Sequence, residues 1–434
     1  MLNPGAPRFA AASVLALNAY LLTAAGSSVG GQQVRLLGIP LTVAGFVLAL
    51  RAASSVDRAD TRPLTSTYLW LAVLTTVGIM LPPRDQPPLW FAIAYRAVPV
   101  AGVILAGIAA GGSARATRAC VWIAVSMAVA LQLVTPLALP QPHIDVWSWT
   151  QVSVRALLHG IHPYTARADD VYGGAYAMGY TNTVYPYMPL TLLVHAPFVA
   201  LFGDYRFGLA LCLPATIWLM RSAGRRLGVE AHLLDVITLA LVLHPRGTYI
   251  VSSGYNEPLL MVTAAAFVYL AVRWPRGVGQ GVAFLFLPAL KQYVVAPVLM
   301  FAADLHSRRL YRPLVVGTLV AAATVVPFVL TNARATVDGI VFQVNPSVAY
   351  RPDSISVTAL AAGLLGFEPW HWLPEAAQLV VGAAVFARLR RHGLGGLLLA
   401  SAIALFASFL VGTQAFLNYY YFVGVLLLLA AITV

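Results

Sequence analysis

One carboxylate, that of Asp145, stands where an apolar run gives way to a polar stretch. It follows a proline-rich turn at 140–144 and opens an amphipathic segment, 146–158. It could cap that helix, which stabilises a helix by roughly 1 kcal/mol. Alternatively it is a general base, because a carboxylate desolvated beside lipid and aromatic rings binds protons more readily. We favour the catalytic base, with His143 as a neighbouring substrate-binding residue.

The only lysine of the chain, Lys291, is the second candidate, and it lies with Pro288 and Gln292 inside the apolar stretch 280–303. A lysine at mid-bilayer costs about 2.5–3.5 kcal/mol on insertion scales. We therefore predict two short helices that meet at Lys291, a re-entrant hairpin that lifts the amine to the outer surface. There it could contact a phosphate as a point charge, or it could be a snorkelling lysine.

The remaining candidates lie in the polar segments between apolar runs. Arg246 and Arg351 could bind a donor phosphate together with Lys291, or they could anchor the outer face. Glu257 could bind substrate or only offset a helix dipole. The aromatic candidates and His371 could equally belong to an interfacial belt. The substrate-binding candidates are His143, Tyr187, Asn256, Glu257, Gln292, His371, Gln414, Asn418 and Tyr419.

The composition determines which elements must position these residues. Of the 434 residues, 60% are hydrophobic and 10% are charged, whereas soluble domains carry about 25% charged residues. The apolar runs of about 20 residues match a hydrocarbon core of roughly 30 Å and do not alternate as barrel strands do. The sequence predicts an all-α polytopic membrane protein. Its net charge of +12 then reflects membrane topology and does not indicate a nucleic-acid partner.

We expect about 12 transmembrane helices. The stretch 140–205 interrupts them, and 186–203, with three prolines, is predicted to form short interfacial helices that do not span. The first run, 9–26, is read as a retained helix because no cleavage site follows it. The expected spans are 9–26, 34–51, 65–82, 92–111, 119–139, 206–224, 232–250, 257–273, 312–331, 375–391, 394–411 and 418–434.

The arginine clusters between the spans predict the topology. With the basic loops placed inside, Asp145, Lys291 and the aromatic segments all face outward. The composition, rich in Ala, Gly and Arg with one lysine, is typical of a bacterial chain. We therefore expect a multi-pass protein of the bacterial plasma membrane with its site on the outer face.

The order of several short motifs resembles the GT-C superfamily of integral membrane glycosyltransferases, which use polyprenyl-phosphate sugars. More narrowly, it resembles actinobacterial polyprenyl-phosphate-mannose-dependent mannosyltransferases, or the related arabinofuranosyltransferases, that build lipoglycans. The resemblance covers roughly 119–434. Its motifs are Asp145 after a span, Tyr-Pro-x-x-Pro-Leu at 185–190, Leu-Phe-Gly at 201–203, Leu-Lys-Gln at 290–292, and Gln414 followed by Asn-Tyr-Tyr at 418–420.

The resemblance implies a GT-C-like bundle in which 119–434 is the catalytic core. In most of these enzymes the aspartate follows the first span, whereas about four extra spans precede Asp145, so either 1–118 is an added module or the fold is a variant. Asp145 would act as base on the acceptor hydroxyl, and Lys291 would contact the donor phosphate. The sugar, mannose by preference, would pass with inversion from a polyprenyl phosphate to a lipid or glycan acceptor.

No cofactor is firmly implied, and a divalent metal is left open. The neighbouring acids Asp169 and Asp170 look like part of a solvated loop. Two alternatives to a transferase remain. One is a secondary transporter or flippase of a lipid-linked sugar, and the other is a non-enzymatic scaffold subunit.

Overall fold

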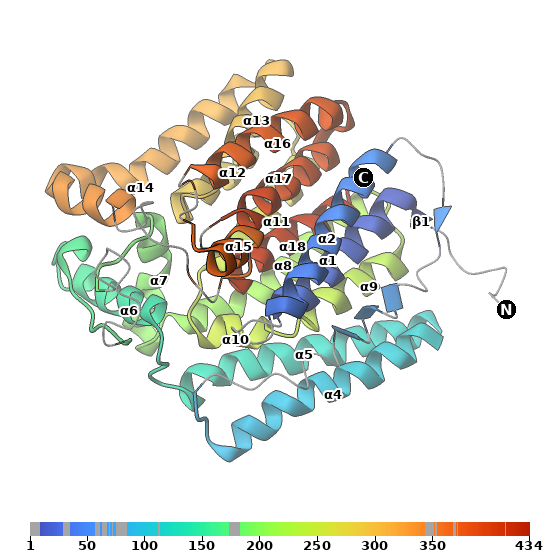
Figure 1. The fold of residues 1–434 in the computed structure, drawn as a ribbon, viewed down its shortest axis with the longest axis horizontal. Helices are drawn as coiled ribbons and strands as arrows, with labels where there is room; N and C mark the ends of the chain where they lie inside the picture. The colour runs from blue at the N-terminus through green and yellow to red at the C-terminus, as the bar shows by residue number, and fades with distance from the viewer. Residues whose placement is uncertain are drawn as a thin grey trace.

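The protein is a bundle of α-helices in the computed structural model (Figure 1). The structure describes residues 9–28, 35–56, 61–62, 67–68, 70–71, 73–74, 85–111, 113–172, 183–342, 351, 354–367, 370, 372–412 and 414–434. Two strands of two residues each, β1 (Phe9–Ala10) and β2 (Thr61–Arg62), pair antiparallel at one edge. Apart from this short ladder, the all-α prediction is confirmed.

The helices follow the apolar runs closely. The first half of the chain holds α1 (Ala11–Ser28), α2 (Arg35–Ser55), α4 (Leu89–Gly111), α5 (Ala114–Ala138), α6 (Asp145–Leu158), α7 (Pro189–Phe202) and α8 (Arg206–Arg226). The second half holds α9 (Ala231–Val242), α10 (Gly247–Ser252), α11 (Glu257–Arg273), α12 (Val278–Leu290), α13 (Val295–Ser307), α14 (Tyr311–Val337), α15 (Val357–Leu365), α16 (Leu373–Leu389), α17 (Gly393–Leu410) and α18 (Leu417–Ala431). Short helical turns are η1 (Pro163–Thr165), η2 (Asp338–Phe342) and η3 (Arg390–His392).

Seven helical stretches among the described residues are long and apolar enough to cross a membrane, and five further apolar helices have 10–17 residues. Large apolar side chains point away from the bundle, among them Leu89 on α4 (77% exposed) and Leu330 on α14 (80% exposed). Such surfaces suit lipid as the surrounding solvent. The chain is therefore a membrane protein, but the expected count of about 12 full-length spans is not confirmed.

The N-terminal helix α1 lies at the centre of the packing and is buried along its whole length. It packs against α2 and α18. The hydroxyl of Tyr20 on α1 donates a hydrogen bond to the carbonyl oxygen of Ala240 on α9, at 2.9 Å. The boundary expected between 1–118 and the following core stays a prediction.

Small residues bring α12 and α14 into close contact. A Cβ added to Gly281 would lie 1.9 Å from the carbonyl oxygen of Pro313, and one added to Gly317 would lie 2.5 Å from the carbonyl oxygen of Gly281. Glycines allow membrane helices to approach at this distance without a side chain between them. This contact holds α12, the helix that ends directly before Lys291, against α14.

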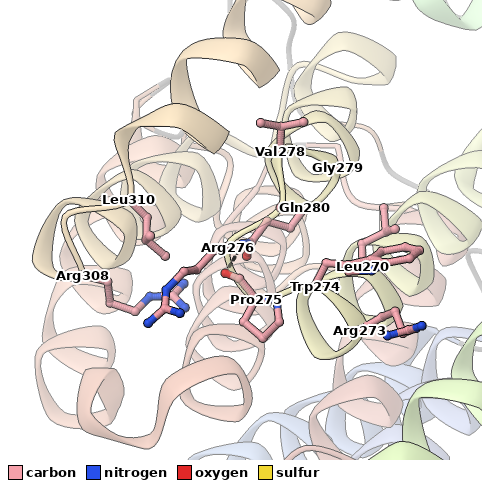
Figure 2. A pocket seen from close by; sticks show the side chains of 11 residues that line it. Leu270, Arg273, Trp274, Pro275, Arg276, Val278, Gly279, Gln280, Arg308 and Leu310 are labelled. Carbon is pink, nitrogen blue, oxygen red and sulfur yellow. Dashed lines mark hydrogen bonds between the residues drawn. The ribbon is translucent and has the colours of Figure 1, made fainter.

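The apolar stretch 280–303 is broken as predicted, into α12 and α13 with Lys291 directly after α12. Gly277 before α12 and Arg308 after α13 line one pocket (Figure 2). The stretch therefore begins and ends on the same side of the bundle, as a re-entrant pair must. Lys291 is not open to solvent at this tip, however, because it is only 3% exposed. Its expected depth at the outer surface of the membrane stays a prediction.

The proline-rich segment 186–203 forms one helix, α7, where several short interfacial helices were expected. Pro189 occupies the first turn, where the missing N–H of proline is tolerated, and Gly203 ends the helix in the left-handed region. Its 14 residues span about 20 Å, less than a hydrocarbon core. The expected span 232–250 is also interrupted, between α9 and α10.

Candidate active site

The amine of Lys291 forms a buried ion pair with Glu257, the first residue of α11. Glu257 is fully buried. Its Oε1 also accepts hydrogen bonds from Asn418 Nδ2 of α18, at 2.8 Å, and from the Tyr293 hydroxyl, at 3.5 Å. The structure thus joins three predicted site residues, Glu257, Lys291 and Asn418. They come from α11, the α12–α13 break and the start of α18.

Three tyrosine rings surround the amine of Lys291. Its Nζ lies 5.0 Å from the ring centroid of Tyr187, 5.2 Å from that of Tyr293 and 4.8 Å from that of Tyr419. Ring faces carry negative potential and attract an ammonium at such distances. Lys291 is therefore held in an aromatic cage, and Tyr187 and Tyr419 line this cage instead of forming only an interfacial belt.

Asp145 begins α6 and is 8% exposed. The N-cap of this helix is Ile144, so the prediction that Asp145 caps the helix is wrong. Asp145 is instead an acidic residue in the first turn of the helix. Its Oδ1 accepts from the backbone N–H of Val146 at 2.7 Å and from the Tyr172 hydroxyl at 3.4 Å. His143 is exposed beside it, with its ring 6.1 Å from that of Tyr172.

Tyr187 links helix α6, which begins at Asp145, with the lysine cage. Its ring contacts that of Trp149, one turn after Asp145 on α6, with 6.5 Å between centroids. Burial raises the pKa of the Tyr187 hydroxyl well above its ordinary value, and the nearby ionisable groups of Tyr419, Asp145 and Glu257 raise it further. Tyr187 therefore stays protonated, and its ring lies between the Lys291 amine and Trp149 of α6.

A buried ion pair that sequence reasoning missed holds α6 in place. Arg206 is fully buried and pairs with Asp204, at 2.7 Å. The same guanidinium donates to the carbonyl oxygen of Leu139, at 2.7 Å, and to that of Ser252, at 2.9 Å. Asp204 also accepts from the indole N–H of Trp147 on α6, at 3.3 Å. The sequence did contain a signal for this ion pair, because Asp204 lies two residues before Arg206 at the start of an apolar run.

Gln292 and Asn256 are the sequence neighbours of Lys291 and Glu257. Their side chains form hydrogen bonds with other segments of the protein. Gln292 Nε2 donates to the carbonyl oxygens of Pro186 and Ile340, at 3.0 and 3.2 Å. Asn256 Oδ1 lies 2.9 Å from Nε2 of the buried His195. Gln292 therefore fixes the segment that carries Tyr187.

Several buried acceptors of this site are unsatisfied within the part of the chain that the structure describes. Glu257 Oε2, Gln292 Oε1 and Asn418 Oδ1 have no hydrogen-bond partner there. A buried acceptor without a donor is costly, by about 1–3 kcal/mol. Together they form a set that a ligand rich in hydroxyl groups would satisfy.

The two arginines that were predicted to bind the donor phosphate differ in their surroundings. The Arg351 guanidinium lies 5.0 Å over the ring of Phe416, whose centroid is 6.1 Å from that of Tyr419. Arg351 is thus one aromatic ring away from the cage. Arg246 instead donates from Nε to the carbonyl oxygen of Ser28, at 3.4 Å, and stacks on Tyr249. Its role at a donor phosphate stays a prediction.

Gln414 and His371 are the last two residues that were predicted to bind substrate. Gln414 is half-buried in the segment before α18, and His371 lies outside the described residues.

Within the described ranges, no group of three or more His, Cys, Asp or Glu side chains could hold a metal ion. Asp169 is exposed, as expected for a solvated loop. The use of a divalent metal stays an open prediction.

No family model matches the chain, and no curated protein matches it either. Among solved structures it is similar to ArnT from Cupriavidus metallidurans bound to undecaprenyl phosphate, with 18% identity and a TM-score of 0.47. The match covers 72% of this chain and 59% of that one, so the chain spans less than two thirds of that protein's length. A likeness of this degree leaves the function to be argued from the site residues.

Proposed function

We propose that the chain is a membrane glycosyltransferase of the GT-C type, which moves a sugar from a polyprenyl-phosphate donor to an acceptor hydroxyl. The observation that carries the proposal is the series of contacts from the Lys291–Glu257 pair through Tyr187 to Trp149, which lies one turn after Asp145 on α6. An acid that can take a proton and a cation that can face a phosphate then flank one buried site. Inverting glycosyl transfer requires these two groups.

In the proposed reaction, the acceptor oxygen attacks the anomeric carbon of the donor. The new glycosidic C–O bond forms as the bond between that carbon and the donor phosphate oxygen breaks, and the configuration inverts. Asp145 takes the proton of the acceptor hydroxyl. The leaving polyprenyl phosphate carries the negative charge, which Lys291 stabilises. A preformed cation in a dry site stabilises such a charge better than water does.

The ion pair with Glu257 changes how Lys291 would act. An ammonium has three N–H donors, and Glu257 accepts one of them. Glu257 therefore orients the amine while the remaining N–H groups are available to a phosphate oxygen. In this proposal Glu257 is a positioning residue, and Arg351 beyond Phe416 is a second cation for the same phosphate.

The unsatisfied acceptors favour a sugar as the group that is moved. Sugar hydroxyls donate hydrogen bonds, and Glu257, Asn418 and Gln292 each present an unsatisfied buried oxygen. Mannose as the sugar, arabinofuranose as the second choice and a lipid or glycan acceptor rest on the motif resemblance. The outer-face site rests on the arginine clusters between the apolar runs. All of these are part of the proposal.

A transporter or flippase of a lipid-linked sugar is the competing proposal. It is favoured by one observation, the buried charge pair at the break between α12 and α13, because discontinuous helices with polar groups mark many transporter sites. The two functions differ in whether a new covalent product forms.

The deciding experiment uses the purified full-length protein in lipid nanodiscs. It is incubated with radiolabelled polyprenyl-phosphate mannose and an extract of bacterial membrane lipids, and the label is followed by chromatography. A transferase yields a new labelled product that grows with time. Label that stays in the donor here, yet crosses the bilayer in protein-containing vesicles, would reject the transferase and support the transporter. Transfer of another sugar from its polyprenyl phosphate would reject mannose alone.

A further inference from the structure

A basic pocket of about 990 Å³ lies at the other end of the helices that carry the site (Figure 2). It is formed where α11 ends, α12 begins and α13 ends. Arg273, Arg276 and Arg308 line it together with Trp274 and Leu310. The side chain of Gln280 donates to the carbonyl oxygen of Pro275 and fixes the turn between α11 and α12.

The pocket has an excess of positive charge. Its described lining includes three arginines and no acid. Arg308 is already paired with Asp304 of α13, and Arg273 lies 5.0 Å over the ring of Trp274. In Figure 2 the guanidinium groups of Arg276 and Arg308 point into the same region. Arg273 points away from these two groups in the same view, so the positive charge that faces an anion comes from Arg276, and from Arg308 beyond its pair with Asp304.

The pocket is distant from the candidate active site. The helix α11 runs from Glu257, in the active site, to Arg273, in the pocket, and 17 residues of α-helix span about 25 Å. Trp274 is exposed at the rim, and tryptophan is enriched where membrane and water meet. The pocket therefore lies at the membrane surface opposite to the Lys291 end of these helices.

The lining combines this charge with apolar surface. Leu270, Val278 and Leu310 lie beside the arginines, as a site for a group that is polar at one end and apolar at the other requires. Arginine forks match phosphate oxygens in pairs of hydrogen bonds. Basic pockets between membrane helices suit the headgroups of anionic lipids.

We propose that this pocket binds the phosphate group of an anionic phospholipid from the surrounding leaflet. The bound headgroup would bridge the ends of α11, α12 and α13. These helices carry Glu257 and flank Lys291 at their opposite ends, so the lipid would hold the re-entrant pair against α11. The proposal does not depend on sugar transfer, and its test measures none.

The test compares the thermal unfolding of the full-length protein in nanodiscs of phosphatidylcholine alone and of phosphatidylcholine mixed with phosphatidylglycerol. A ligand that binds only the folded state raises Tm. We expect phosphatidylglycerol to raise Tm in the wild type, and the double variant Arg273→Gln/Arg276→Gln to lose most of that rise. This variant leaves the Arg308–Asp304 pair intact. Native mass spectrometry should show fewer phosphatidylglycerol molecules retained by it.

The matched control is Arg388→Gln/Arg390→Gln, which removes two exposed arginine charges elsewhere. It should keep the full rise. An equal loss in the control, or no rise in the wild type, would overturn the proposal. A third arm adds inorganic phosphate to the phosphatidylcholine nanodiscs. If phosphate alone produces the same rise, and that rise requires Arg273 and Arg276, the source is a soluble anion and the lipid assignment is rejected.

Discussion

Lys291 and Glu257, separated by 34 residues along the chain, meet as a buried ion pair at the point where α12 gives way to the break before α13. Each charge is removed from solvent, and each has further partners from other helices. A buried pair of this kind is weak support for net stability, because desolvation offsets the attraction between the charges. Its presence at a helix break is better explained by a role at the site.

The pair should be sensitive to the loss of one partner and tolerant of the loss of both. Lys291→Met leaves Glu257 as an uncompensated buried charge, so we expect a loss of about 3–5 kcal/mol in unfolding free energy. The double variant Lys291→Met/Glu257→Gln should recover most of this stability. Both variants should still lack sugar transfer, because neither has the cation. The measurement is denaturant unfolding of the purified protein in detergent, followed by the transfer assay. A double variant as unstable as the single one would contradict the pairing.

The sequence identified the parts of the site but not their relation. The lone lysine in an apolar run predicted the helix break, because an amine at mid-bilayer must be relieved by a change in the backbone. The burial of Lys291 could not be predicted in the same way. Its partner Glu257 is 34 residues away, and Tyr187 and Tyr419 reach the amine only through the packing of α7 and α18. The segments holding Asp204 and Arg206 looked like an ordinary span start, since their contacts with Leu139 and Ser252 exist only in the folded chain.

Asp145 should be required for transfer and dispensable for folding. In Asp145→Asn, the side-chain oxygen can still accept from the Val146 N–H, so α6 should begin at the same residue. The amide cannot take the acceptor's proton, and we expect transfer to fall by about 10²–10⁴-fold. The assay is the labelled-product measurement at saturating donor. Asp169→Asn, at an exposed acid, is the control and should keep the normal rate. Transfer by Asp145→Asn at the control rate would eliminate Asp145 as the base.

Arg206 should affect the site through the position of α6. Arg206→Lys keeps the charge beside Asp204, but a single ammonium cannot reach the carbonyl oxygens of both Leu139 and Ser252 as the guanidinium fork does. We expect a lower Tm and a lower kcat, with the second effect arising because Trp147 and the start of α6 lose their anchor. Arg225→Lys, at an exposed position near the end of α8, is the matched control. An unchanged kcat together with a lowered Tm would limit Arg206 to a purely structural role.

The contact between α12 and α14 gives a prediction about stability that involves no charge. A Cβ at Gly281 would lie 1.9 Å from the carbonyl oxygen of Pro313, so Gly281→Ala must push the two helices apart. We expect a loss of about 1–3 kcal/mol from this overpacking, although alanine has the higher intrinsic helix propensity. Gly107→Ala on α4 is the control, because its added Cβ meets nothing within 4 Å in the structure as described. It should be neutral or stabilising in the same unfolding measurement. If both variants behave alike, α12 and α14 do not pack backbone to backbone at Gly281.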